Sequence, residues 1–239
     1  EAMSVKISEG EKWSQDWENL LSQADFFCIK WMGNGLDTPF FKKLLPFLQV
    51  TKASYYIDAA GTEENEIVSG IEKPILYKIK MYSLYNGLVN FKNLWLYTKH
   101  IFSHREDIAF EEPDKSFWSG IYHPRALEVY TDLTSYLQDF CNPKRSTIGI
   151  LFYRDEWVWG DLAYQNKLIE EIESHGLNVI CVFSNGMPIE EMGMPSLDEV
   201  FKRYFTLEEA VVVHALINCM KFSLTTSRSL SLEFLERLN

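Results

Sequence analysis

Hydrophobic and polar residues alternate in two separate series along the chain, and each series predicts strands separated by helices. In the first series, residues 25–32 form a nearly continuous apolar run, the pattern of a strand that is buried on both faces, and residues 53–58 predict a second strand. Between them, Thr38 and Pro39 precede a stripe of apolar residues, which is typical of a helix start. A strand, a helix and a strand in close succession favour a parallel β-α-β unit.

The second series starts at residue 147 and repeats the alternation. Its expected elements are, in chain order, a strand, a helix, a strand, a helix and a strand: 147–153, 162–174, 178–183, 196–204 and 210–217. A last helix is expected from Ser229, and in an open sheet another strand would follow it. We therefore expect the sheet of this part to be incomplete and the chain to be a piece of a longer protein.

The segment between the two series combines helical and acidic stretches. Residues 74–103 predict a helix with a break or a close approach at Gly87, residues 106–119 are acidic and irregular, and residues 126–140 predict another helix. We predict an α/β protein of two lobes, with mostly parallel, Rossmann- or flavodoxin-like sheets flanked by helices and joined by a long helix and a linker. The expected parts are a first lobe, a linker with its connecting helix, and a truncated second lobe: 1–105, 106–144 and 145–239.

Composition narrows the class of protein. The chain has 239 residues, of which 46% are hydrophobic, so it can bury the core of one large domain or of two ordinary ones. Its net charge of −11 argues against nucleic-acid binding, because such proteins usually carry a basic face. Neither a signal peptide nor an apolar stretch long enough to cross a bilayer is found, so we expect a cytoplasmic protein without a membrane span.

Sequence motifs for metals and phosphates are missing. The four cysteines are far apart and form no Cys-x-x-Cys pair, and the pair of His100 and His104 has no third ligand nearby. Neither Gly-x-Gly-x-x-Gly nor the phosphate loop Gly-x-x-x-x-Gly-Lys-[Ser/Thr] occurs, and neither do the common hydrolase and zincin motifs. We predict no metal site and no cofactor bound by this chain.

Polar breaks follow four of the expected strands, at residues 33–37, 58–62, 153–161 and 184–186. Ligands of open parallel sheets bind at the carboxyl ends of the strands, so the breaks are candidate sites. The third break is unusual because charged and large aromatic residues follow the strand directly. The candidate substrate-binding residues at this edge are Tyr153, Arg154, Trp157, Trp159, Asn185 and Gly186.

Two interpretations of the third break stay open. Its charged residues 154–156 can pair with one another or cap the next helix, with Asp161 as the N-cap. Trp157 and Trp159 would point to opposite sides of an extended segment, so at least one of them is expected to be exposed or packed on another domain. An exposed tryptophan beside an arginine fits either an apolar ligand with carboxylates or an interdomain face.

Three motifs carry a resemblance to a known family. Residues 120–124 read Gly-Ile-Tyr-His-Pro, residues 146–154 read Ser-Thr-Ile-Gly-Ile-Leu-Phe-Tyr-Arg, and residues 168–180 read Leu-Ile-Glu-Glu-Ile-Glu-Ser-His-Gly-Leu-Asn-Val-Ile. They resemble the large subunit of the tetrapyrrole metal chelatases, which includes the CobN-type subunit of aerobic cobaltochelatase and the H subunit of magnesium chelatase. In that family the third motif is roughly Leu-Ile-x-x-Leu-Glu-x-[Arg/Lys]-Gly-hydrophobic-Asn.

Two features depart from the family pattern. Asn86 stands where the first glycine of a Gly-Gly pair is usual. The five residues 155–159, Asp-Glu-Trp-Val-Trp, are bulkier than the small residues and glycine that often follow the arginine in the family.

The resemblance implies an activity for the parent protein and partners for this chain. The chain would be an N-terminal fragment, inactive by itself, of an ATP-dependent complex that inserts cobalt or magnesium into a tetrapyrrole, with cobalamin-type biosynthesis favoured. ATP-Mg would be used by separate AAA+ subunits, which agrees with the missing phosphate loop. The expected partners are the tetrapyrrole substrate, the AAA+ subunits and the remaining domains of the same large subunit.

Roles for single residues follow from the chemistry of metal insertion, which needs a base for the pyrrole protons. The resemblance makes His123 and Glu156 candidate catalytic bases, and Arg154 a partner for a propionate or acetate group. A structural His123, with its ring hydrogen-bonded to the backbone, is an equally open interpretation. The alternative function is a non-catalytic scaffold whose Trp-rich segment docks on other domains or on the AAA+ ring. A free-standing small-molecule-binding protein is the third interpretation.

Overall fold

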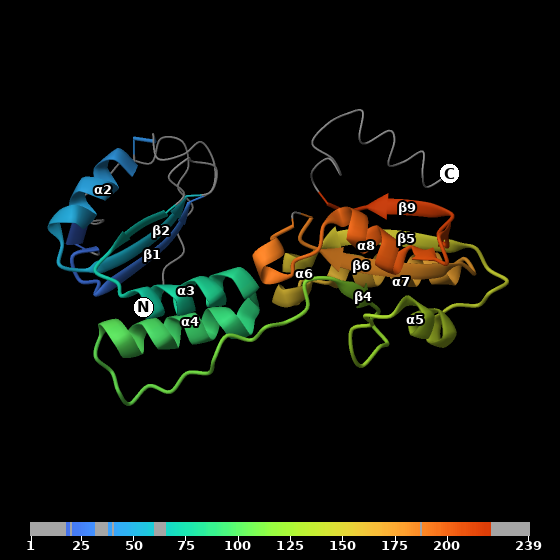
Figure 1. Ribbon diagram of the computed structural model, residues 1–239, viewed down its shortest axis with the longest axis horizontal. Coiled ribbons are helices and arrows are strands. Elements are labelled where there is room, and N and C mark those ends of the chain that lie inside the picture. The colour runs from blue at the N-terminus through green and yellow to red at the C-terminus, as the bar shows by residue number, and fades with distance from the viewer. Residues whose placement is uncertain are drawn as a thin grey trace. The chain divides into compact units, whose positions relative to one another are not determined.

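The computed structural model divides into two compact units, which are described separately below (Figure 1). One unit consists of residues 1–85 and 89–114, and the other of residues 86–88 and 115–239. The acidic segment expected to be a separate linker is therefore shared between the two units. No helix in the part of the chain that the structure describes is long and apolar enough to cross a membrane. The described residues are 18–19, 21–31, 38–39, 41–59, 66–186 and 188–220.

The first unit contains a mixed sheet in the order β1-β2-β3. Strand β1 (Phe26–Trp31) pairs in parallel with β2 (Ser54–Ala59), and helix α2 (Phe41–Val50) connects them. The parallel β-α-β unit predicted from the sequence is thus confirmed. Strand β3 (Glu66–Ser69), which the apolar pattern did not predict, adds to β2 in the antiparallel direction.

Helices cover both faces of this sheet, as Figure 1 shows. Alternate residues of the strands point to opposite faces, so Tyr55 and Ile57 pack with α2 while Tyr56 packs with the helices on the other side. Two helices form that second layer, α3 (Lys73–Tyr85) and α4 (Gly87–Phe102). The result is a three-layer α/β/α unit with a separate core on each side of the sheet.

The helical signal over residues 74–103 corresponds to two helices, and the break that was one of the two expectations for Gly87 lies between α3 and α4. Asn86 and Gly87 both have positive φ angles, 57° and 82°, in the left-handed region that ends a right-handed helix. Asparagine tolerates this region better than other residues with a side chain. The structure therefore explains why Asn86 can replace the glycine that the family usually has at this position.

The second unit is built on a four-stranded sheet in the order β4-β6-β5-β9. Its central strand β5 (Thr147–Tyr153) pairs in parallel with both β6 (Asn178–Ser184) and β9 (Ala215–Asn218). Strand β4 (Gly120–Tyr122) is antiparallel and covers one edge of β6. Both of these sheets thus combine parallel pairs with one antiparallel strand at an edge, as in a mixed α/β fold.

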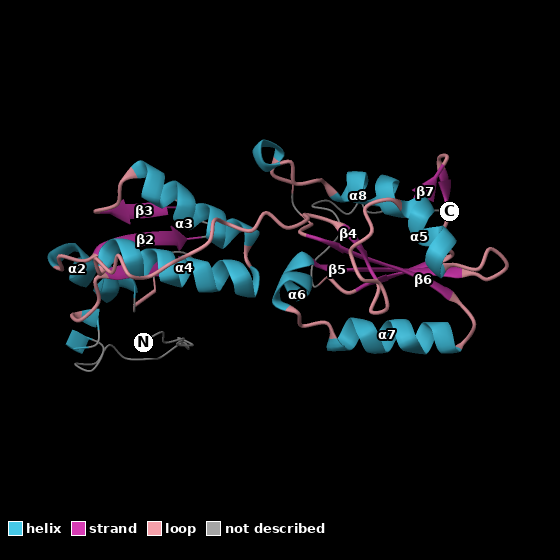
Figure 2. Cartoon of the chain, turned by 90° about the horizontal axis from the view of Figure 1, so that it is seen from below, coloured by secondary structure: helices cyan, strands magenta, loops and turns pink. Residues whose placement is uncertain are grey.

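Helices also cover both faces of the second sheet (Figure 2). On one face, α7 (Ala163–Ser174) and the short α6 (Arg154–Trp159) pack against Ile150, Phe152 and Phe183. On the other face, α5 (Leu133–Phe140) and α8 (Leu197–Tyr204) pack against Leu151 and Val182. The alternation of β5 and β6 side chains between two cores explains why both strands read as continuous apolar runs.

Three expectations for this unit need correction. The strand expected over 210–217 is divided, because β8 (Ala210–Val211) forms a small hairpin with β7 (Thr206–Leu207) before β9 begins. The helix expected over 126–140 begins only after Asp132, whose carboxylate accepts a hydrogen bond from the Ser135 backbone N–H. Asp161 is not an N-cap, since α7 begins after Leu162 without a side-chain cap. A short 3₁₀ helix, η2 (Glu190–Met192), precedes α8.

Several expected features lie outside the described residues. They are the polar break at 33–37, the part of the second break from residue 60 and the helix from Ser229.

Candidate functional site

The carboxyl edge of the second sheet brings together most of the predicted site residues. Strands β5 and β6 run in parallel with Tyr153 opposite Ser184, so both strands end at the same level. Helix α6 starts directly after Tyr153, and Asn185 and Gly186 follow Ser184. The two polar breaks of this unit are therefore neighbours at one edge, as the sequence predicted for an open parallel sheet.

Arg154 is the first residue of α6 and is fully buried. Its Nε donates a hydrogen bond to the Phe117 carbonyl at 2.6 Å, and its Nη2 donates one to Ser116 Oγ at 2.7 Å. The guanidinium also lies over the Trp118 ring, 4.6 Å from its centroid. Arg154 thus ties α6 to the segment before β4, and contact with a substrate carboxylate would require it to leave these partners.

The Trp-rich segment is helical rather than extended. Trp157 stacks on Phe183 with ring centroids 4.2 Å apart, so it belongs to the core between α7 and the sheet. Trp159 lies two residues further, about 200° around the helix, and its side chain is 41% exposed. One tryptophan therefore anchors α6 while the other faces outward.

Glu156 is held by the following helix. Gln165 Nε2 donates a hydrogen bond to Glu156 Oε2, while Gln165 itself is buried. Within the described residues, the buried Gln165 Oε1 has no hydrogen-bond partner. The Glu156 carboxylate also lies near Cys219, where burial first and this negative charge second raise the pKa of the thiol. Glu156 is thus a positioned, half-buried carboxylate at the sheet edge, the kind of group that can accept a proton.

The remaining predicted residues of this edge form a tight turn after β6. Asn185 Nδ2 donates to the Met194 sulfur at 3.2 Å, and the Gly186 N–H donates to Ser184 Oγ at 3.3 Å. Gly186 has a φ of 81°, which a residue with a side chain rarely adopts. The turn gives this edge a fixed backbone.

His123 lies away from the carboxyl edge. Strand β4 is antiparallel with Tyr122 opposite Cys181, so the chain leaves β4 toward the amino end of β6. In this register, His123 is level with the β6 residue that lies four positions before Ser184, a distance of about 13 Å along a strand. The structure therefore does not bring His123 and Glu156, the two predicted bases, to one end of the sheet.

Both ring nitrogens of His123 are used by the protein. The Arg125 backbone N–H donates to Nδ1 at 3.2 Å, and Nε2 lies 3.3 Å from Glu173 Oε1, so the proton sits on Nε2 and is donated to Glu173. The ring is buried and lies 4.3 Å from the Phe140 ring, centroid to centroid. Burial lowers the pKa of His123, against the opposing effect of Glu173. A neutral histidine bonded to backbone matches the structural interpretation left open above.

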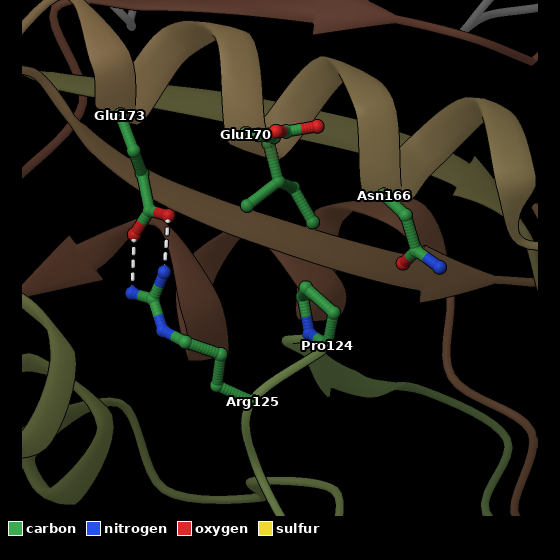
Figure 3. A pocket seen from close by; sticks show the side chains of 6 residues that line it. Pro124, Arg125, Asn166, Glu170 and Glu173 are labelled. Atoms are coloured by element: carbon green, nitrogen blue, oxygen red, sulfur yellow. Dashed lines mark hydrogen bonds and ion pairs between the residues drawn. The ribbon is translucent and has the colours of Figure 1, made fainter.

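Arg125 and Glu173 complete this cluster. The two Nη atoms of Arg125 donate to the two carboxylate oxygens of Glu173, both at 2.7 Å. Burial tends to raise the pKa of Glu173, but the hydrogen bonds from Arg125 and the charges around it lower it overall. In Figure 3, Arg125 reaches from the loop after β4 to Glu173 on α7, with Pro124 opposite the middle of the helix.

A pocket of about 460 Å³ lies beside this cluster. Next to it, the Tyr122 hydroxyl donates to Asn166 Oδ1 at 2.7 Å and so holds the loop against α7. The lining combines an apolar centre with an ion pair and an amide, which suits a small polar group. The lining residues are Pro124, Arg125, Asn166, Ile169, Glu170 and Glu173 (Figure 3).

Sequence reasoning missed Glu173, Arg125 and Gln165. Glu173 did leave a signal, since it is the glutamate of the Leu-Ile-x-x-Leu-Glu motif, and its partner His123 belongs to the Tyr-His-Pro motif. The structure thus joins two family motifs that are 50 residues apart. Arg125 and Gln165 stand in no motif, and only the fold gives them partners.

Other family-like residues serve packing. Asn178 is buried, and its side chain bonds to Asn142, Arg145 and Thr147, which fixes the start of β5. A Cβ atom at Gly120 would lie 2.3 Å from a methyl group of Val129. Packing alone therefore accounts for Gly120 and Asn178 in the motifs, and no ligand is needed to explain either residue.

Side chains that could hold a metal ion are not grouped in the described part of the chain: no three His, Cys, Asp or Glu residues there are suitably arranged.

Comparison with known proteins places these motifs in one family. The family model described as CobN/Magnesium Chelatase matches residues 80–238. An uncharacterized protein of Methanocaldococcus jannaschii is 35% identical over 176 residues, which cover 71% of this chain and 14% of that protein. The magnesium-chelatase subunit ChlH of Oryza sativa subsp. indica is 30% identical over 91 residues, 34% of this chain and 7% of that subunit.

One further sequence relative and one solved structure complete the comparison. The magnesium-chelatase H subunit of Rhodobacter capsulatus is 32% identical over 80 residues, 34% of this chain and 6% of that protein. The catalytic subunit of cobaltochelatase from Mycobacterium tuberculosis aligns in structure over 87% of this chain and 15% of its own, with a TM-score of 0.46 and 13% identity. The chain spans about a seventh, or less, of the length of the relatives it matches. It belongs to the CobN/magnesium chelatase family.

Proposed function

We propose that this chain is part of the large, tetrapyrrole-binding subunit of an ATP-dependent chelatase, which inserts cobalt, or else magnesium, into a tetrapyrrole. The family match over residues 80–238 carries this proposal. The identity to two magnesium-chelatase H subunits supports it. Cobalt is favoured, in a cobalamin-type pathway, with the metal as a substrate. ATP would be hydrolysed by AAA+ partner subunits, as the family resemblance implies, and the missing phosphate loop in this chain agrees with that.

The carboxyl edge of the second sheet is the part of this chain that we assign to the tetrapyrrole. Trp159 presents an exposed indole, which can stack on a flat macrocycle. Glu156, oriented by Gln165, is the carboxylate placed to accept a pyrrole proton. His123 would have a structural role, holding the loop after β4, because both of its ring nitrogens already bond to protein groups.

Titration of the chain with a corrinoid precursor and with a porphyrin, followed by tryptophan fluorescence, tests the assignment. We expect saturable quenching, and we expect Trp159→Ser to lower the affinity for the tetrapyrrole. Leu127→Ser, which changes a fully exposed apolar residue elsewhere in the unit, is the matched control and leaves affinity unchanged. In the full-length subunit with its AAA+ partners, Glu156→Gln should lower the rate of metal insertion with little change in tetrapyrrole affinity. Binding of neither macrocycle at high micromolar concentration rules out direct contact by this chain.

A docking role is the second candidate, and one observation favours it. Arg154 bonds to the carbonyl of Phe117, a residue with a half-exposed side chain, and thereby fixes it to the helix that carries Trp159. Two exposed aromatic residues on rigid supports are typical of a protein contact. Trp159→Ser in the full-length subunit separates the two functions: lost complex assembly with intact tetrapyrrole affinity supports docking, and the reverse supports the substrate site.

A further inference from the structure

Positive charge is concentrated in the two helices α3 and α4. Residues 73–102 contain five lysines and no acidic residue or arginine, whereas the whole chain has a net charge of −11. The rest of the chain therefore carries a net charge of −16. Two of the five lysines are paired with glutamates of the same unit, Lys78 with Glu112 and Lys80 with Glu66.

Two other lysines lie on the outer surface of α4 together with large aromatic side chains. Phe91 is 55% exposed and Trp95 is 44% exposed, and Lys99 Nζ lies 5.1 Å from the centroid of the Trp95 ring. At 100° per residue, Phe91, Lys92, Trp95 and Lys99 fall within about 100° of one another around the helix. These four residues are called the α4 outer face below.

The opposite side of α4 is the side that holds the helix in its unit. Asn90 and Asn93 are buried and bond to the backbone of Asp114 and Glu111, and Tyr97 is buried between helices. These buried contacts anchor α4 from the side opposite the α4 outer face. Exposed aromatic residues on a helix, flanked by cations, are the composition of a binding face.

We propose that the α4 outer face docks on an apolar surface with acidic side chains in the remainder of the large subunit. This inference rests on the proposed function, since it needs a subunit much longer than this chain. The matched relatives leave room for such a partner, because the chain covers only 14% of the M. jannaschii protein and 7% of the rice subunit. The charge argument selects the partner, because burying Lys92 and Lys99 beside two aromatic rings requires carboxylates across the interface.

Hydroxyl-radical footprinting read by mass spectrometry tests the proposal on the full-length subunit and on the 239-residue chain. We expect Phe91 and Trp95 to be labelled about fivefold less in the full-length subunit, as roughly half-exposed rings become interface core. Tyr77, 63% exposed on α3, is the matched control and should be labelled equally in both. Charge reversal by Lys92→Glu with Lys99→Glu should abolish the protection, and Lys→Arg changes should keep it.

The possible outcomes separate this inference from the proposed function. Equal labelling of Phe91 and Trp95 in both proteins overturns the docking face. Protection that appears only when anionic lipid vesicles are added also overturns it, because the face would then bind a membrane surface instead of the subunit. Protection in a full-length subunit that binds no tetrapyrrole would keep the docking face and overturn the proposed function. The Phe91→Ser, Trp95→Ser double variant of the 239-residue chain should keep its circular dichroism spectrum, because both side chains are exposed. Loss of that spectrum contradicts the proposal by showing that the face is structural.

Discussion

Replacing Arg154 by alanine should destabilise the second unit strongly. The change removes two hydrogen bonds from a charged group, worth about 1.5–3 kcal/mol each, and a cation–π contact of about 0.5–2 kcal/mol. It also leaves the Phe117 carbonyl without this donor. Against these losses stands the cost of burying the guanidinium, which the variant avoids. We expect a net loss of about 3–5 kcal/mol in the free energy of unfolding of this unit.

Urea denaturation with pulsed hydrogen exchange measures the effect where it should occur, in peptides from β5 and β6. With a urea m-value of about 2 kcal/mol/M, the Arg154→Ala midpoint should fall by about 1.5–2.5 M. Arg145→Ala, at an exposed arginine, is the control and should change the free energy by less than about 0.5 kcal/mol. Arg154→Lys should fall between the two, because it keeps the charge without the fork of donors. An Arg154→Ala midpoint equal to that of the control would refute the role of Arg154 in tying α6 to the segment before β4.

Three further predictions concern other parts of the fold. The pKa of His123 in the folded protein is lowered below 6.5, so acidification through 6.5 protonates the unfolded chain first, and the free energy of unfolding falls by at most about 1.4 kcal/mol per pH unit. His123→Gln should flatten this dependence of the urea midpoint on pH between about pH 5 and 7, and an unchanged slope contradicts the assignment. Gly87→Ala should destabilise the α3–α4 break, because its Cβ would lie 2.8 Å from the Val158 carbonyl at a positive φ, whereas Asn86→Gly should be tolerated; equal melting temperatures for the two variants count against this account. Gly120→Ala should lower the midpoint for β4 and β6 in hydrogen exchange, because a methyl group there meets a valine at 2.3 Å, and no change would show that the site relaxes freely.

The apolar pattern predicted the central elements well, for a physical reason. Strand β5 was expected at 147–153 and occupies those residues, because a strand buried on both faces must be apolar throughout. Helix α6 was missed because six residues are too few to show a helical period, and tryptophan and valine are weak helix formers. The break at Asn86 was only partly anticipated, since an asparagine does not mark a positive φ as clearly as a glycine does.

The candidate site was less predictable, because it depends on tertiary contacts. An arginine at the end of a strand suggests a ligand contact, because arginine side chains are mostly exposed and are almost never fully buried unless they are paired. Its partners at 116–118 stand in an irregular segment with no pattern of its own. Likewise, the sequence names His123 and Glu173 in separate motifs, and only the pairing of β4 with β6 brings them together.

The central place of β5 also constrains how the second unit can fold. Its two neighbours come from distant parts of the chain: Thr147 pairs with Asn178, 31 residues later, and Ile148 pairs with Ala215, 67 residues later. Such long-range pairing closes large loops before it gains any contact, so this unit should fold slowly and as one cooperative step. During synthesis, an apolar strand edge stays open until residue 218 has emerged. A truncation before β9 would make that edge permanent and favour aggregation.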